Sequence, residues 1–161
     1  MPTKIKRPGI GRKLKHIDLE VTRECNLRCR HCSASSKKRG LELSENQIKE
    51  ILEQARGLGL EKVGLTGGEP FLVREKIKNI GNFAVNELKT PIHIHSNGTK
   101  ITKQDAEWIK NIDAEITVPL YGNIASIHEK ITDVEGRSSK LAEDLIILSM
   151  LERMFAFIWC Q

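Results

Sequence analysis

Apolar and polar residues alternate along this chain with two different periods. A period of two predicts four short strands, at residues 16–22, 62–66, 91–96 and 114–120. A period near 3.6 predicts helices between them, with apolar stripes that include Ile48, Ile77 and Ile109. A loop and a last apolar helical stretch from about residue 139 follow the fourth strand. This alternation is typical of a parallel sheet with right-handed helical crossovers.

Capping residues mark the starts of two of these helices. Ser44 is followed three residues later by Gln47, and Thr102 is followed at the same spacing by Asp105. In a capping box, the first side chain accepts from the third backbone amide, and the third side chain accepts from the first. We therefore expect helices to begin at Ser44 and Thr102.

Four polar or glycine-rich segments each follow one of the predicted strands. They are the cysteine loop (residues 25–32), Gly67 to Pro70, Ser96 to Gly98, and Tyr121 with Gly122. In α/β barrels and open parallel sheets alike, active sites form at the carboxyl ends of the strands. We therefore expect the four segments to converge on one mouth.

Composition indicates a folded protein in a reducing compartment. Hydrophobic residues make up 39% of the chain and charged residues 29%, and no apolar run approaches the ~20 residues of a membrane helix. A basic leader at residues 1–13 lacks the apolar core of a secretory signal. These features predict a cytoplasmic protein without a membrane segment, in which thiols stay reduced.

Three of the four cysteines lie within eight residues, as Cys25, Cys29 and Cys32. Clustered cysteines in a reducing compartment indicate a metal site rather than disulfides. Three thiolates on one loop can hold three irons of a [4Fe-4S] cluster and leave the fourth iron open to an outside ligand. The fourth cysteine, Cys160, is treated as incidental.

A structural zinc site is the alternative for these cysteines, with His31, His93 or His95 as a fourth ligand. Structural zinc sites favour paired ligands from two separated segments, and the sequence offers no second pair. His31 also adjoins Cys32, so both side chains cannot easily point at one metal. The spacing favours the iron–sulfur interpretation.

The CxxxCxxC spacing after the first strand, with Gly-Gly-Glu-Pro after the second, resembles the radical S-adenosylmethionine (SAM) superfamily over residues 14–148. The resemblance implies a [4Fe-4S] cluster whose open iron binds SAM, and reductive cleavage of SAM to a 5′-deoxyadenosyl radical that abstracts hydrogen from a substrate. It also implies a reduced ferredoxin or flavodoxin-type electron donor. The cysteine-loop style is similar to that of peptide maturases, haem-biosynthesis proteins and molybdenum-cofactor cyclases. Substrate groups in this family come largely from the second half of the core and from extensions, so both a small molecule and a peptide stay open as the substrate.

The same resemblance assigns further residues to SAM. The segment that binds its methionine ammonium, through the carboxylate of the third residue, consists of Gly67, Gly68, Glu69 and Pro70. His31 occupies a position at which relatives carry an aromatic residue near the adenine, although a loop histidine can simply be solvated. Ser96 and Asn97 face the SAM or substrate space, or else form a plain tight turn.

Two positions on the later strands leave alternatives open. His93 and His95 share one strand face, which points into the barrel or holds buried structural histidines. Pro119 stands where many relatives carry a serine that contacts the SAM ribose, and proline cannot donate that hydrogen bond.

The expected architecture is an incomplete parallel (β/α) barrel of about four β/α units. The predicted division is a leader at residues 1–13, an incomplete core at 14–148 and an apolar tail at 149–161. Because the family core has six units, we expect a truncated, frameshifted or split chain that lacks strands five and six. Strand 114–120 would then form the sheet edge, and Ile116 and Val118 would face inward without an opposite wall, as an exposed apolar patch.

A net charge of +5 is concentrated in the leader and around the cysteines. This excess is a solvated surface, or a docking surface for an acidic electron-donor protein. Aromatic residues are only 4% of the chain, which argues against single-stranded nucleic acid as a partner. The rival functions are a cluster-binding fragment without turnover and a zinc-stabilised nucleic-acid-binding module.

Overall fold

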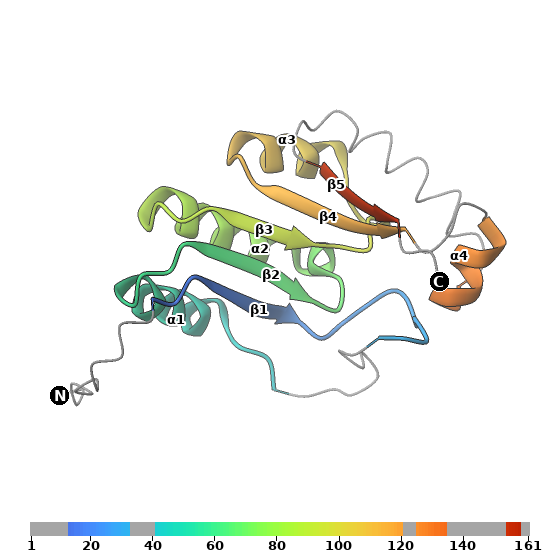
Figure 1. The fold of residues 1–161 in the computed structure, drawn as a ribbon, viewed down its shortest axis with the longest axis horizontal. Coiled ribbons are helices and arrows are strands. Elements are labelled where there is room, and N and C mark those ends of the chain that lie inside the picture. Colours follow the sequence, from blue (N-terminus) through green and yellow to red (C-terminus); the bar gives the residue numbers. More distant parts are fainter. Residues whose placement is uncertain (1–12, 33–40, 121–124, 135–153, 159–161) are drawn as a thin grey trace.

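The computed structural model describes residues 13–32, 41–120, 125–134 and 154–158. Its centre is a five-stranded sheet of parallel strands in the order β1-β2-β3-β4-β5 (Figure 1). The strands are β1 (His16–Thr22), β2 (Lys62–Gly67), β3 (Ile92–His95), β4 (Glu115–Leu120) and β5 (Met154–Ile158). The four strands predicted from the period of two are all present.

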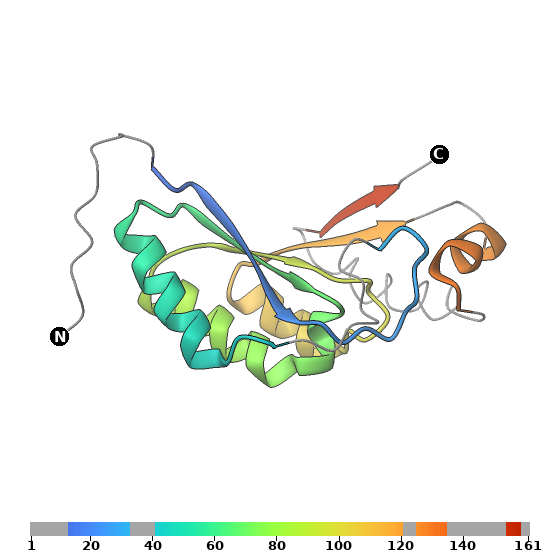
Figure 2. The same ribbon diagram turned by 90° about the horizontal axis from the view of Figure 1, so that it is seen from below.

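Helices α1 to α3 cover one face of the sheet (Figure 2). They are α1 (Glu45–Gly57), α2 (Arg74–Asn82) and α3 (Lys103–Asn111). A 3₁₀ turn at Pro70–Val73 leads into α2, and a π-helical turn at Phe83–Glu87 follows it. Helix α4 (Ala125–Thr132) lies beyond the carboxyl ends of the strands instead of on that face.

The hydrophobic core lies between the sheet and these three helices. Alternate strand residues turn toward the helices and are buried, among them Leu19, Val21, Val63, Leu65, Ile92, Ile94, Ile116 and Val118. They pack against the apolar stripes of the helices, which include the predicted Ile48, Ile77 and Ile109. Each such side chain contributes roughly 1.5–3 kcal/mol when it is fully buried.

The opposite face of the sheet is polar. Strand register aligns Asp18, Gly64, His93 and Glu115 across β1 to β4. A second row, one pleat nearer the carboxyl ends, pairs Glu20 with Thr66 and His95 with Thr117. In a parallel (β/α) barrel this face is the interior, so the inside of the barrel wall is lined by groups that can form hydrogen bonds.

Both predicted capping boxes are present. The Ser44 hydroxyl accepts from Gln47 N at 3.2 Å, and Gln47 Oε1 accepts from Ser44 N at 2.9 Å. Thr102 and Asp105 form the same reciprocal pair at the start of α3. Local side-chain chemistry therefore fixes where two of the crossover helices begin.

The structure corrects the expected edge of the sheet. β5 pairs with β4 in parallel, with Ile116 opposite Met154 and Leu120 opposite Ile158, so β4 is not the edge strand and a fifth strand is not missing. Ile116 and Val118 have no exposed surface, because they face the helices and not the barrel interior. The prediction of an exposed apolar patch at these two residues is wrong.

Two helical details also differ from expectation. The segment after β4 was predicted to be a loop, yet it contains α4. The helical stretch expected from about residue 139 and most of the leader lie outside the described residues, as does Cys160. In the described part of the chain, no helix combines the length and apolar character needed to cross a membrane.

Candidate functional site

A cavity of about 460 Å³ opens at the carboxyl ends of the strands. Its lining brings together the predicted Cys25, Cys29, Cys32, His31, Gly67, Gly68, Ser96 and Asn97, with Glu20, Leu27, Thr66, His95, Thr117 and Pro119. The loops after β1, β2 and β3 therefore converge as the sequence predicts. Tyr121 and Gly122 lie outside the described residues, and the predicted Glu69 and Pro70 do not line the cavity.

The cysteine loop carries three free thiols on one wall of this cavity. Cys25 and Cys29 are partly buried, and Cys32 is exposed. Leu27 is buried and anchors the loop, and its backbone amide donates to Cys25 Sγ at 3.4 Å. Cys32 N donates to Cys29 O at 3.2 Å, which closes the loop between the second and third cysteines.

The chemistry of the three thiols fits a cationic iron–sulfur cluster. Burial, together with the neighbouring Cys25 and Cys32 thiolates, raises the pKa of Cys29 to about 11. Burial also raises the pKa of Cys25. Three thiolates gathered in one cavity repel one another, so their ionised form needs a positive partner such as cluster iron. Within the described residues, no three Cys, His, Asp or Glu side chains are already grouped as a metal site.

The turn after β3 is tied to the cysteine loop by side-chain amides. Asn97 Nδ2 lies 3.8 Å from Cys25 Sγ and 3.0 Å from Asn26 Oδ1, and it donates to both. Asn26 Nδ2 in turn donates to Thr99 Oγ1 at 2.8 Å. The sequence indicated Asn97 but missed Asn26 and Thr99, although an asparagine beside the first cysteine was a signal available in the sequence.

Glu69 is fully buried beside the cavity, behind the turn that follows β3. Its Oε1 accepts from Phe71 N at 3.0 Å and from Ser96 Oγ at 2.8 Å, and Oε2 accepts from Asn97 N at 2.8 Å. Burial raises the pKa of the Glu69 carboxyl, and the three hydrogen bonds oppose that rise. The carboxylate therefore holds the turn after β2 against the turn after β3.

Gly67 and Gly68 allow two backbone segments to touch. Gly67 has φ of +131°, and a Cβ there would lie 2.1 Å from Thr22 O. A Cβ on Gly68 would lie 2.0 Å from Glu24 O. Gly68 N donates to Thr22 O at 2.8 Å and Glu69 N donates to Glu24 O at 2.7 Å. Only glycine fits these contacts, which bring the turn after β2 against the start of the cysteine loop.

The histidines on the polar sheet face are arranged as a pair. His95 lines the cavity, and His93 lies one pleat deeper, with ring centroids 4.2 Å apart. His93 Nε2 and Thr117 Oγ1 are hydrogen-bonded at 2.6 Å. Burial, with the neighbouring His95, lowers the pKa of His93 to about 4, and burial lowers that of His95 as well. Both rings are therefore neutral at pH 7.

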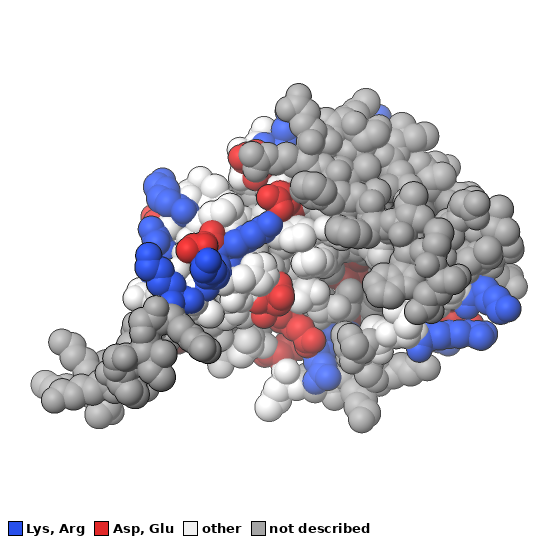
Figure 3. Space-filling view, in the orientation of Figure 1, with Lys and Arg blue, Asp and Glu red and all other residues white. Residues whose placement is uncertain are grey.

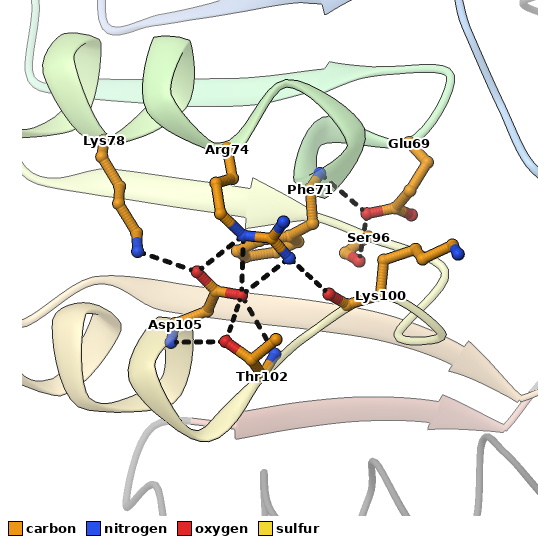
Figure 4. A network of polar contacts seen from close by, with 8 residues as sticks. All are labelled: Glu69, Phe71, Arg74, Lys78, Ser96, Lys100, Thr102 and Asp105. Carbon is orange, nitrogen blue, oxygen red and sulfur yellow. Dashed lines mark hydrogen bonds and ion pairs between the residues drawn. The ribbon is translucent and has the colours of Figure 1, made fainter.

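A second buried carboxylate, Asp105, lies on the helix side of the sheet (Figure 4). Arg74 Nη2 lies 3.2 Å and Lys78 Nζ 2.9 Å from its oxygens, and Arg74 Nη2 also donates to Lys100 O. Burial raises the pKa of Asp105, but the hydrogen bonds from Arg74, Lys78 and Thr102 outweigh it and hold the pKa at about 2. This network ties α2 to α3.

Comparisons with known proteins agree with this geometry. The family model for the radical SAM superfamily matches residues 19–147. A GTP 3′,8-cyclase of Pasteurella multocida is 28% identical over 129 residues, which are 77% of this chain and 38% of the cyclase. Streptococcus suis SuiB, solved with its precursor peptide SuiA, has a TM-score of 0.74 and 21% identity over 91% of this chain and 32% of its own.

A further solved structure shares the fold. The protein anSMEcpe with bound AdoMet superposes with a TM-score of 0.66 and 20% identity, over 91% of this chain and 43% of its own length. These structural matches confirm the predicted fold class, a partial parallel (β/α) barrel. The chain therefore spans less than half of the length of each of these three relatives.

Proposed function

The chain belongs to the radical SAM superfamily, and from this premise we propose that it binds a [4Fe-4S] cluster and SAM in the cavity lined by the cysteine loop. The observation that carries the proposal is that Cys25, Cys29 and Cys32 share one cavity with Gly67 and Gly68. When bound, the cluster supplies the electron that cleaves SAM to methionine and a 5′-deoxyadenosyl radical, which abstracts hydrogen from a substrate.

The three thiolates hold three irons in this proposal, and nearby donors support the first of them. Leu27 N and Asn97 Nδ2 both donate to Cys25 Sγ. Hydrogen bonds to a sulfur favour its thiolate form and tune the group that it binds. Asn97 therefore couples the cluster ligand to the turn after β3.

The methionine end of SAM is assigned to the turn from Gly67 to Pro70. Gly67 and Gly68 line the cavity with backbone alone, so a ligand can approach closely. Glu69 Oε2 accepts one hydrogen bond from Asn97 N, which leaves acceptor capacity for an ammonium group. Pro70 is buried and starts the 3₁₀ turn that fixes this segment.

The remaining assignments concern the rest of SAM. His31 is exposed at the mouth and lines the cavity, where its ring can stack on the adenine. Ser96 and Asn97, in the turn after β3, line the same cavity. Pro119 also lines the cavity but has no N–H, so we propose that the ribose is bound by other residues.

The electron donor is proposed to dock on the basic edge of the molecule beside the cysteine loop. Arg28, Arg30 and Lys130 are exposed there, and Figure 3 shows Lys and Arg side chains over the region of α4 and the cysteine loop. This charge suits an acidic ferredoxin or flavodoxin-type protein. Reduced thiols and such a donor both fit the cytoplasm, which stays our proposed compartment.

The substrate is proposed to be a small molecule or a peptide. SuiB is solved with a precursor peptide, whereas the Pasteurella relative is named for a nucleotide, so the relatives span both classes. A chain that spans less than half of these relatives also favours a second candidate, a cluster-binding piece that does not turn over alone.

Anaerobic reconstitution with iron and sulfide tests the proposal. We expect a brown protein with about four irons per chain, and 5′-deoxyadenosine on addition of SAM and dithionite. A brown protein that forms no 5′-deoxyadenosine would support the second candidate instead. A colourless protein that retains zinc would reject both and favour the zinc-stabilised module.

A further inference from the structure

The end of α4 contacts the cysteine loop through the backbone. Arg28 N donates to Thr132 O at 3.2 Å, and Arg30 N donates to Ile131 O at 3.1 Å. These two amides flank Cys29, so the hydrogen bonds hold the loop on either side of the second cysteine. Thr132 is fully buried at this contact.

Unsatisfied backbone groups on both partners explain the contact. The last four carbonyls of an α-helix have no acceptor role within the helix, and an irregular loop likewise leaves amides without partners. Asp133 follows α4 with φ of +55°, a left-handed conformation that ends the helix. Ile131 and Thr132 therefore offer their carbonyls to the loop instead of continuing the helical ladder.

The two ends of the cysteine loop depend on different parts of the fold. The start of the loop is held by the turns after β2 and β3, through Glu24 and Asn26. Among the described residues, α4 supplies the backbone hydrogen bonds that Arg28 and Arg30 form outside the loop. The position of Cys29 thus depends on a segment about a hundred residues later in the sequence.

We propose that the carboxyl-terminal turn of α4, Ile131 to Asp133, is a brace that positions Cys29 for the cluster. The brace rests on the proposed function in that it controls how firmly the cluster is held. Asp133 is a positioning residue here, because its left-handed conformation directs the two carbonyls, and its own side chain is exposed. The expected result of losing the brace is faster release of iron, with the other two cysteines still in place.

The chain offers a matched control for this proposal. Asp113 follows α3 with φ of +53° and is exposed like Asp133, but it lies at the opposite ends of the strands, just before β4. A β-branched residue is disfavoured at such a φ, whereas glycine adopts it freely. Asp133→Val and Asp113→Val should therefore strain the backbone alike, and only the first should disturb the cysteine loop.

The test compares iron release from the reconstituted variants to a chelator. Asp133→Val should lose its visible absorption about tenfold faster than the unchanged protein, in line with the strain of a left-handed residue. Asp113→Val and Asp133→Gly should release iron at the unchanged rate. Both valine variants should lower the thermal unfolding midpoint equally, because the backbone strain is the same. A merely structural role of Asp133 would also lower this midpoint, so the rate of iron release is the measurement that identifies the brace.

Amide exchange in the iron-free protein separates this proposal from the proposed function. The Arg28 and Arg30 amides should exchange slowly in the unchanged protein and in Asp113→Val, and faster in Asp133→Val. Equal rates of iron release from the two valine variants would overturn the proposal. If the protein takes up no iron, the proposed function fails, but the brace can still be tested by amide exchange. Equal exchange of the Arg28 and Arg30 amides in Asp113→Val and Asp133→Val would then overturn the brace as well.

Discussion

Glu69 and Asp105 are both fully buried carboxylates, but they lie on different sides of the molecule and are neutralised in different ways. The Asp105 carboxylate, on the helix side, forms ion pairs with Arg74 and Lys78 and accepts a hydrogen bond from Thr102 N at the start of α3. The Glu69 carboxylate, on the cavity side, accepts hydrogen bonds from two backbone amides and a hydroxyl. Figure 4 draws those from Phe71 and Ser96. Among the described residues, Asp105 forms ion pairs and Glu69 forms none.

This difference separates a structural carboxylate from one suited to a ligand. Direct pairing with Arg74 and Lys78 overcomes the burial of Asp105, so its pKa falls to about 2. Burial raises the pKa of Glu69, and the neutral hydrogen-bond donors and the more distant charge of Lys100 offset this rise only in part. A buried carboxylate without a cationic partner, next to a cavity, is a candidate for binding a cationic ligand.

The largest effect should come from the cysteines of the cavity side. Cys25→Ala, Cys29→Ala or Cys32→Ala should each abolish iron binding, because each removes one of the three proposed thiolate ligands. Iron content and visible absorption after anaerobic reconstitution provide the measurement. Cys160→Ala is the control and should retain the colour. Bleaching by Cys160→Ala together with retention by Cys32→Ala would show that the ligand assignment is wrong.

The next effect concerns ligand binding at Glu69. Glu69→Gln should leave the iron content intact and weaken SAM binding about tenfold to a hundredfold, since a charge-assisted hydrogen bond contributes about 1.5–3 kcal/mol. Isothermal titration of the reconstituted protein measures the affinity. Asp105→Asn, the matched change on the helix side, should leave the affinity unchanged. An unaltered SAM affinity in Glu69→Gln would remove the distinction between the two carboxylates.

For the free energy of unfolding, the carboxylate on the helix side, Asp105, should matter more than its role in SAM affinity suggests. Asp105→Asn should lower the free energy of unfolding by about 2 kcal/mol at pH 7, because the amide cannot replace the ion pairs with Arg74 and Lys78. Denaturant unfolding of the iron-free protein measures this change. A loss well below 1 kcal/mol would mean that the network in Figure 4 does not stabilise the contact between α2 and α3.

Lowering the pH should gradually remove the same contribution of Asp105 to the free energy of unfolding. The pKa of Asp105 is depressed from 3.8 to about 2, so its contribution is complete above about pH 4 and is lost as the pH falls toward 2. The difference in unfolding free energy between the unchanged protein and Asp105→Asn should therefore shrink to near zero over this interval. A difference that stays constant down to pH 2 would contradict the assignment.

The helix side could be read from the sequence because its determinants are local. Apolar spacing gave the helix stripes, and the pairs Ser44–Gln47 and Thr102–Asp105 gave the helix starts. The orientation of Ile116 was misjudged because alternation identifies two faces of a strand without saying which one meets the helices. Here the polar face is the barrel interior, so the apolar face is covered by the helices.

Non-local contacts account for what the sequence did not predict. β5 is a short apolar run whose register is set by pairing with β4, and no turn signal precedes it. Strand-end motifs correctly predicted the convergence of Cys25, Gly67 and Asn97 on one cavity. The burial of Glu69 depends on the conformations of two separate loops, which residue types alone do not specify.

The strictly sequential strand order has a consequence for how the chain folds. Each strand after β1 pairs with the strand that precedes it in the sequence, so a growing chain can add one β/α unit at a time to an existing sheet edge. Loop closure at each step then spans a single unit, which keeps the entropic barrier low. The cysteine loop differs, because in the described part of the chain the backbone partners of Arg28 and Arg30 outside the loop lie at the end of α4, which is synthesised about a hundred residues later. We therefore expect the cysteines to emerge early during translation and to reach their final positions late.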